Sequence, residues 1–304
     1  MNYYNEIKNE LINNEINKSV KDYSKNKYEL QRYYNVGKLL SEAGKHYGDS
    51  IIKEYSKRLS MELDKRYSVR YLYDIRKLYF FSKVHPLDAQ LTISHYRLLF
   101  PLSDNNEIDY YIEQTIKRKL SKRQLQEIIK SQEYGRLPEN TKSKLIEQND
   151  TNVVDFVKNP IFIRNNDNYD LFSEKALQKM ILEDIPSFLE ELGHGFTFIK
   201  NEYPIKLGDR YNYIDLLLFN IEYNCYVVVE LKVTELKKEH IGQIQVYMNY
   251  IDQNVKKVSH DKTIGIIICK QDNEYIIKYC SDGRIVARRY ELVWFLGGIN
   301  YELL

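Results

Sequence analysis

The chain has 304 residues, of which 43% are hydrophobic and 29% are charged, and its formal net charge is +2. This length suggests about two domains, and the composition is sufficient to bury a core. No apolar run is long enough to cross a membrane and the polar start of the chain is unlike a signal peptide, so we exclude a membrane protein and expect a cytoplasmic one.

The charge is divided unevenly along the chain. Residues 1–150 hold 27 Lys and Arg against 21 Asp and Glu, whereas the remainder holds 18 against 22. A basic first half and an acidic second half suit a nucleic-acid-binding module joined to a metal-binding one. The three cysteines, Cys225, Cys269 and Cys280, lie in apolar runs without metal-ligand spacing, and we expect core residues in a reducing cytosol.

Residues 1–147 are predicted to form a helical DNA-binding domain. A helix is expected over residues 28–44, and Ile52, Tyr55, Leu59 and Leu63 recur at helical spacing in the next one.

Ser68 is the expected N-cap of a third helix, whose apolar face carries Leu72 and Ile75. Two helices joined by the short basic turn 64–67 resemble a helix-turn-helix, in which the second helix enters the major groove. The candidate DNA contacts are then Lys65, Arg66, Arg70 and Lys77. The alternative is that these basic side chains are merely solvated.

The rest of this half continues with helices and ends in a connection. Pro101 ends one helical piece, and Ser121 is the expected N-cap of another. We interpret His95 as structural. Residues 131–160 are polar and contain glycine and proline, so the inter-domain connection lies here, with domains over residues 1–147 and 148–304.

The second half alternates between helix and strand patterns. Ser173 is the expected N-cap of one long helix that runs to Leu192 and is closed by Gly193. We predict a helix over residues 236–252, and the expected strands cover residues 196–202, 213–220, 225–232, 263–270, 275–279 and 285–290.

The hairpin formed by residues 213–220 and 225–232 carries three charges among apolar neighbours. A symmetric tip between Glu222 and Tyr223 places Asp215 directly opposite Glu230, with Cβ atoms about 5 Å apart. Lys232 lies two residues beyond Glu230 and shares its face. Such carboxylates repel one another unless a cation lies between them, and Mg²⁺ accepts few carboxylates plus water and phosphate oxygens. The pattern outlines a metal-dependent phosphodiester cleavage site, although opposed charges also form structural ion pairs.

Asp215, Glu230, Leu231 and Lys232 match the D…ExK signature of the PD-(D/E)XK nuclease superfamily. Gln243 and Tyr247, four residues apart on the following helix, match the QxxxY element of many such nucleases. The blocks FLEELGHGFTF, YIDLLLFN, CYVVVELK, HIGQIQVYMNYID and TIGIIICK resemble the YhcG-like family, as do YYNVGKLL, YSVRYLYDIRKLY, LTISHYRLLF and LSKRQLQEII in the first half. The resemblance covers nearly the whole chain, although tryptophans often found around the SHY block are missing.

The resemblance implies an α+β protein of two domains. The first would be an all-α, winged-helix or helix-turn-helix-like DNA-binding domain, and the second an α/β restriction-endonuclease-like domain. It implies an Mg²⁺-dependent deoxyribonuclease, with Mn²⁺ as a substitute. Asp215, Glu230 and the carbonyl of Leu231 would hold the metal, with Glu174 as an additional ligand and Glu183 as its rival.

Within this implied mechanism, Lys232 orients or activates the attacking water. Gln243 positions Lys232 or the backbone, and Tyr247 packs or contacts phosphate. Two alternatives remain open: a structure-selective nuclease like the Holliday-junction resolvases, acting on branched DNA as a homodimer, and a DNA-binding protein whose nuclease site is inactive or needs a partner. The residues do not decide between a role in DNA repair and one in defence.

Overall fold

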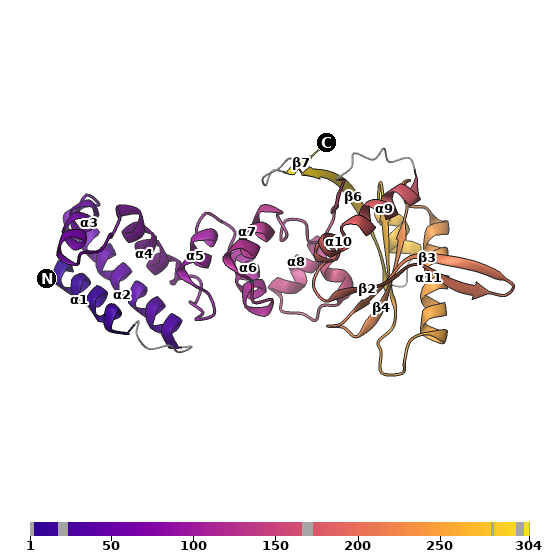
Figure 1. Cartoon of the computed structure of the whole chain (residues 1–304), viewed down its shortest axis with the longest axis horizontal. Coiled ribbons are helices and arrows are strands. Elements are labelled where there is room, and N and C mark those ends of the chain that lie inside the picture. The colour runs from indigo at the N-terminus through magenta and orange to yellow at the C-terminus, as the bar shows by residue number, and fades with distance from the viewer. Residues whose placement is uncertain (1–2, 18–23, 166–172, 281–282, 296–300, 304) are drawn as a thin grey trace. The chain divides into compact units, whose positions relative to one another are not determined.

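The computed structural model describes residues 3–17, 24–165, 173–280, 283–295 and 301–303 (Figure 1). The chain forms two compact units, residues 1–135 and 136–304. The helix α8 (Glu139–Ile146) belongs to the second unit, where the hydroxyl of Thr141 donates to the carbonyl of Asp155 at 2.8 Å. The boundary proposed from the sequence, after residue 147, lies beyond this helix instead of before it.

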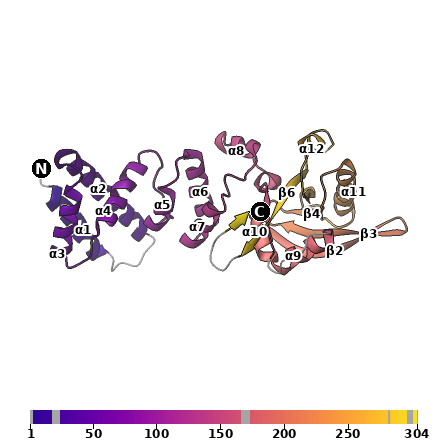
Figure 2. The same ribbon diagram turned by 90° about the horizontal axis from the view of Figure 1, so that it is seen from above.

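The first unit is built from helices. They are α1 (Tyr3–Asn17), α2 (Ser24–Tyr47), α3 (Ile51–Glu62), α4 (Val69–Phe81), α5 (Ile93–Leu99), α6 (Asn105–Lys117) and α7 (Lys122–Lys130) (Figure 2). A winged helix needs a β-hairpin, and the part of this unit that the structure describes contains no strand. The all-α prediction is therefore met there, whereas the wing is not seen.

Two predicted helix starts in this unit are confirmed. The Ser68 hydroxyl accepts from the amide of Tyr71 at 3.2 Å, and the Ser121 hydroxyl accepts from the amide of Gln124 at 3.3 Å. Both caps satisfy an amide that the first helical turn leaves without a partner. Leu72 and Ile75 are fully buried, as the helical spacing predicts.

The second unit contains a mixed sheet of seven strands among the described residues, in the order β1-β6-β5-β4-β3-β2, with β7 paired to β6. Strands β2, β3 and β4 are antiparallel neighbours, whereas β4, β5, β6 and β1 are paired in parallel. The strands are β1 (Ile161–Arg164), β2 (Phe196–Leu207), β3 (Arg210–Asn220), β4 (Cys225–Leu231), β5 (Ile264–Cys269), β6 (Ile285–Phe295) and β7 (Tyr301–Leu303).

Helices cover both faces of this sheet (Figures 1 and 2). The first core lies under α9 (Glu174–Glu183) and α10 (Ile185–Leu192), and the second lies under α11 (Lys238–Asn254). The short 3-10 helix η1 (Val153–Phe156) packs into the first core. Strands buried on both sides are continuously apolar, which explains the run of β5.

Two predictions about elements are wrong. The long helix of residues 173–192 is two helices, α9 and α10, which meet at Asp184. Pro186 has no amide to continue the hydrogen bonding of α9, and the Asp184 carboxylate instead caps α10 by accepting from the amide of Ser187 at 3.3 Å. Ser173 does cap the start, as predicted.

Residues 275–279, predicted as a strand, lie in the helix α12 (Glu274–Cys280). The side-chain oxygen of Asn273 accepts from the amides of Tyr275 and Ile276, at 3.1 and 3.2 Å, and so satisfies the first turn of a helix. A short apolar run of this kind is ambiguous between helix and strand when read by periodicity.

Candidate active site

The hairpin register brings the predicted carboxylates together. Leu216 pairs with Val229 and Asn220 pairs with Cys225, as the predicted symmetric tip requires. Continued by one residue past Leu216 and Val229, the last pair of the shared ladder, the same register sets Asp215 opposite Glu230. Asp215 is held there because its Oδ2 accepts from the amide of Leu231 at 2.8 Å.

The lysine of the pattern lies between two acids. Lys232 Nζ is 3.5 Å from Oε2 of Glu230 and 3.4 Å from Oε2 of Glu174, the first residue of α9. Glu183, the rival to Glu174, lies at the opposite end of α9, where it pairs with Lys179 at 3.8 Å. The fold thus joins Glu174, and not Glu183, to the hairpin site.

The following helix supplies a further contact to the same carboxylate. Gln243 Nε2 donates to Glu230 Oε2 at 3.2 Å and to the hydroxyl of Tyr247 at 3.0 Å. Both residues are on α11, four apart and so on one face. The sequence predicts that Gln243 positions Lys232 or the backbone. In the structure its side chain contacts Glu230 instead. Tyr247 is buried and packs in the core below α11.

The electrostatics of the site are dominated by burial. Glu230 is only 2% exposed, and burial, followed by repulsion from Asp215, raises its pKa to about 8. Burial also raises the pKa of Asp215, although the Leu231 amide and Lys232 oppose this shift. For Lys232, burial lowers the pKa, but Glu230, Glu174 and Asp215 outweigh it and the net direction is upward. The lysine therefore stays protonated.

One oxygen in this cluster has no hydrogen-bond partner among the described residues. Glu230 Oε1 is buried and forms no hydrogen bond within the described structure. A buried carboxylate oxygen of this kind is costly unless it binds a cation or a donor. Together with the opposed Asp215, it fits a divalent ion with oxygen ligands. Among the described residues no three His, Cys, Asp or Glu side chains already form a metal cluster, so water and phosphate would complete the coordination.

One residue that positions this site, Gln178, was not predicted from the sequence. Gln178 of α9 is buried, and its Nε2 donates to the backbone carbonyl of Asp215 at 3.0 Å. This bond ties β3 to α9, the helix that carries Glu174. The available signal was a glutamine beside Leu177 on the inward face of a helix, where a polar side chain needs a buried partner.

The predicted DNA contacts lie in the first unit. Lys65 and Arg66 are in the turn between α3 and α4, and Arg70 and Lys77 are on α4. All four side chains are exposed. Helix α4 uses its other side to pack against α2, so the exposed side is open to a ligand. The geometry of a helix pair with a basic turn is therefore present, and DNA contact stays a prediction.

The sequence predicts that His95 and the three cysteines have structural roles. His95 is buried, and its Nδ1 accepts from the amide of Thr92 at 3.1 Å, which is a capping contact. Cys225 and Cys269 are buried, and burial raises their pKa to about 11 and about 12. The side chain of Cys280 lies outside the described residues. No described helix has the length and apolar character needed to cross a membrane.

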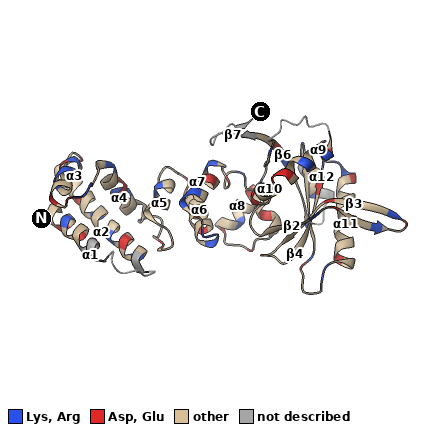
Figure 3. Ribbon diagram, in the orientation of Figure 1, with Lys and Arg blue, Asp and Glu red and all other residues tan. Residues whose placement is uncertain are grey.

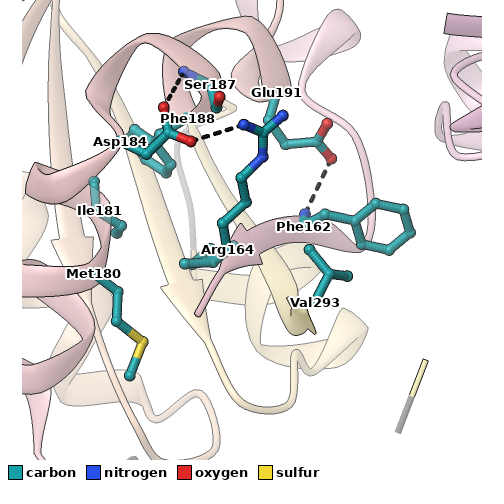
Figure 4. A pocket seen from close by; sticks show the side chains of 10 residues that line it. Phe162, Arg164, Met180, Ile181, Asp184, Ser187, Phe188, Glu191 and Val293 are labelled. Atoms are coloured by element: carbon teal, nitrogen blue, oxygen red, sulfur yellow. Dashed lines mark hydrogen bonds and ion pairs between the residues drawn. The ribbon is translucent and has the colours of Figure 1, made fainter. Parts of the chain in front are cut away.

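A pocket in the second unit is separate from the candidate site (Figure 4). Its polar groups are paired with one another: Arg164 donates to Asp184 at 2.8 Å, and the amide of Phe162 donates to Glu191 at 3.0 Å. None of the predicted catalytic or metal-binding residues lines it. The lining residues are Phe162, Ile163, Arg164, Met180, Ile181, Asp184, Ser187, Phe188, Glu191 and Val293.

Comparison with known proteins finds similarity to nucleases. A family model described as the YhcG PDDEXK nuclease domain matches residues 154–293, and one described as the DUF1016 N-terminal domain matches residues 8–136. A curated protein of Escherichia coli (strain K12), "Putative nuclease YhcG", is 23% identical over 293 residues, which is 83% of this chain and 78% of that protein. The two matched regions together account for most of the chain.

Two solved structures are similar to part of the chain. A crystal structure of a repair endonuclease from Pyrococcus abyssi aligns with 22% identity and a TM-score of 0.29, over 40% of this chain and 48% of that one. A complex of EndoMS with double-stranded DNA aligns with 19% identity and a TM-score of 0.29, over 43% of this chain and 49% of that one. The chain thus spans about half the length of either protein.

Proposed function

We propose that this chain, whose residues 154–293 belong to the YhcG family of PDDEXK nuclease domains, hydrolyses DNA phosphodiester bonds with the help of a divalent metal ion. One observation carries the proposal. Asp215 and Glu230 are opposed in a buried site, beside a protonated lysine, and Glu230 Oε1 has no protein partner in the described structure. Such a cluster is unfavourable by itself and fits a bound cation.

The proposed ion is Mg²⁺, with Mn²⁺ as a substitute. Asp215 and Glu230 would hold it, with the Leu231 carbonyl and Glu174 as further candidate ligands. A bound divalent ion lowers the pKa of a coordinated water and offsets charge on a phosphate. Gln178 and the Leu231 amide keep Asp215 in place, at 3.0 and 2.8 Å, and Gln243 does the same for Glu230 at 3.2 Å.

Lys232 acts as a cationic hydrogen-bond donor in this scheme. The three surrounding carboxylates raise its pKa, so it does not serve as a base at neutral pH. Its Nζ would orient the attacking water and stabilise the extra negative charge on the phosphate oxygens as the new bond forms. Glu174 and Glu230, at 3.4 and 3.5 Å, fix its position.

The first unit supplies DNA affinity in the same proposal. The exposed basic residues Lys65, Arg66, Arg70 and Lys77 occupy the turn and second helix of the α3–α4 pair. Phosphate contacts of this kind provide affinity and position without reading sequence. They would deliver DNA to the nuclease unit of the same chain.

The test is a cleavage assay with the purified full-length protein. Labelled linear duplex, single strand and four-way junction are incubated with Mg²⁺, Mn²⁺ or EDTA. The Asp215→Ala and Lys232→Ala variants should lose cleavage by at least about a hundredfold, because each removes a charge that acts on the reacting phosphate. The matched controls are Asp261→Ala and Lys270→Ala, which remove exposed charges of the same unit and should cleave normally.

The results of the cleavage assay distinguish the candidate functions. Metal-dependent cleavage that is lost in the site variants and kept in the controls supports the nuclease. Undiminished cleavage by a clean Asp215→Ala preparation would overturn the site. A strong preference for four-way junctions would favour the resolvase-like alternative, and binding without cleavage in every metal would favour a DNA-binding protein that needs a partner.

A further inference from the structure

The hairpin of β2 and β3 extends beyond the rest of the sheet. Strand β4 pairs with β3 only from Leu216 to Asn220, whereas the β2–β3 pairing continues outward to Leu207 and Arg210. Residues 203–207 and 210–214 therefore form a two-stranded segment, which we call the projecting ribbon. Figure 1 shows it extending past the other strands of the second unit, and Figure 3 shows basic residues along it.

The two faces of the projecting ribbon differ. Ile205 and Ile214 are fully buried and pack into the core below α11, which anchors one face. On the other face Tyr211 is 63% exposed and Tyr213 is 56% exposed. Tyr211 pairs with the exposed Lys206 across the ribbon. Neither tyrosine ring contacts another ring in the described part of the chain, so core packing does not explain this face.

The exposed tyrosines lead directly to the candidate active site. Side chains two residues apart on a strand share a face, so Tyr211 and Tyr213 project from one face of β3, on the stretch that leads to Asp215. The rise of a strand places Tyr213 about 7 Å and Tyr211 about 13 Å along it from Asp215. This spacing matches successive nucleotides of one strand that leaves the reacting phosphate. Lys206, which pairs with Tyr211, and Arg210, which precedes Tyr211 in the chain, are both exposed on the ribbon and complement its phosphates.

We propose that the projecting ribbon binds unpaired nucleotides of the DNA substrate, whose bases stack on Tyr211 and Tyr213 while Lys206 and Arg210 contact the phosphates. The inference rests on the proposed nuclease function, and it names the substrate class as DNA with a single-stranded segment beside the cleaved bond. Exposed aromatic rings bind unpaired bases, because paired bases already stack within the duplex. Two basic side chains on a narrow ribbon also suit one strand better than the broad phosphate surface of a duplex.

The experiment measures binding by the full-length protein in EDTA, without cleavage. The probes are a forked duplex with 2-aminopurine in its unpaired arm and a blunt duplex of the same length. Tyr211→Ala/Tyr213→Ala should weaken binding of the fork by at least about tenfold and abolish the fluorescence quenching that stacking causes. The double alanine variant should lose several-fold less affinity for the blunt duplex than for the fork. Tyr211→Phe/Tyr213→Phe should retain both signals, and Tyr275→Ala, which removes a tyrosine 73% exposed on α12, is the matched control.

A second variant keeps the proposal testable if the double alanine variant does not fold. Lys206→Ala/Arg210→Ala should reduce the slope of log affinity for the fork against log salt by about 1.4, which corresponds to two phosphate contacts on a single strand. Unchanged fork binding and quenching in the tyrosine variant, or an unchanged salt slope in this one, would overturn the inference. Equal losses of affinity for the fork and the blunt duplex would also overturn it, since the ribbon would then bind the backbone of the duplex.

The outcome is independent of whether the site cuts DNA. If the protein binds and quenches the fork but cleaves nothing with Mg²⁺ or Mn²⁺, the nuclease proposal fails and the ribbon inference stands. If it cleaves blunt duplex and fork equally, and the tyrosine variant behaves like the wild type, the nuclease proposal stands and the ribbon inference fails.

Discussion

Glu230 is the residue at which stability and proposed function conflict most directly. Its carboxyl is buried opposite another carboxyl, and one of its oxygens has no hydrogen-bond partner in the described structure. Folding therefore favours the neutral form, which is why its pKa rises to about 8 from 4.5. A residue selected only for stability would not be a carboxylic acid here. The unfavourable charge is what a divalent ion would compensate.

We predict that Glu230→Gln stabilises the metal-free protein at high pH. Because the pKa of Glu230 is raised in the folded state, its carboxyl costs nothing below about pH 4.5 and costs progressively more as the pH rises through about 8. In EDTA the variant should match the wild type at pH 5 and exceed it at pH 9 by on the order of 2–4 kcal/mol. Denaturant unfolding at both pH values measures this, and a difference independent of pH would contradict the assignment.

The wild type and the Glu230→Gln variant also test the metal site, without any measurement of cleavage. Adding Mg²⁺ at pH 8 should raise the melting temperature of the wild type, because an ion that binds only the folded state stabilises it. Glu230→Gln should show a much smaller rise, since it cannot supply the anionic oxygen. An equal rise in both proteins would place the ion elsewhere.

Gln243 is expected to affect the affinity of the site for Mg²⁺ and not to be essential for cleavage. Its Nε2 donates to Glu230 Oε2, so Gln243→Ala leaves the carboxylate less firmly oriented. Contacts of this kind typically change metal affinity by about 10- to 100-fold. The Mg²⁺ concentration for half-maximal cleavage should therefore rise while cleavage at saturating Mg²⁺ stays close to normal. Gln253→Ala, an exposed glutamine of the same helix, is the control.

At the scale of elements, the site depends on how closely α11 approaches the sheet. Gly265 of β5 lies under this helix, and a Cβ atom there would be 2.7 Å from Met248 Sδ and 2.8 Å from Ile244 Cδ1. Both side chains belong to the helix that carries Gln243 and Tyr247. The glycine is therefore needed for close packing, and the packing places Gln243 against Glu230.

We predict opposite effects for two glycine substitutions at this helix. Gly265→Val should destabilise the second unit by about 1–3 kcal/mol through overpacking, and it should also weaken the stabilisation by Mg²⁺. Gly242→Ala should stabilise by about 0.5–1 kcal/mol, since Gly242 lies within α11 and a Cβ there meets nothing within 4 Å. Denaturant midpoints measure both. A tolerated Gly265→Val would show that the helix can move away without cost.

At the scale of the whole molecule, the two units differ in charge. The first 150 residues are basic and the rest are acidic, and the acidic unit contains the proposed metal site. An acidic site repels the DNA backbone until a cation is bound, so affinity is best supplied by another unit. This division leads to a prediction about salt dependence.

Replacing Lys65, Arg66, Arg70 and Lys77 by alanine should reduce the salt dependence of duplex binding by the full-length protein. Four lost phosphate contacts correspond to a decrease of up to about 3.6 in the slope of log affinity against log salt. The control replaces the exposed Lys38, Lys45, Lys122 and Lys130, which changes the net charge equally. Equal slopes for the two quadruple variants would reject a specific DNA-binding role for the α3–α4 pair.

The features that depend on neighbours along the chain could be predicted from the amino-acid sequence alone. Asp215 and Glu230 could be paired because a short tip fixes the register of a hairpin, and the strand pleat then sets the faces. Ser68, Ser121 and Ser173 could be assigned as caps because each cap bonds an amide three residues away. The hairpin, the lysine and the helix that follows them were all local patterns of this kind.

The contacts between distant segments could be assigned only from the folded structure. It joined Glu174 to Lys232, directed Gln243 to Glu230, and brought Gln178 to the backbone of Asp215. It also made residues 275–279 a helix, where a short apolar run permitted either assignment. These outcomes depend on how helices pack across a sheet, because a side chain's partner there is set by the shape of the whole core and not by its spacing along the chain.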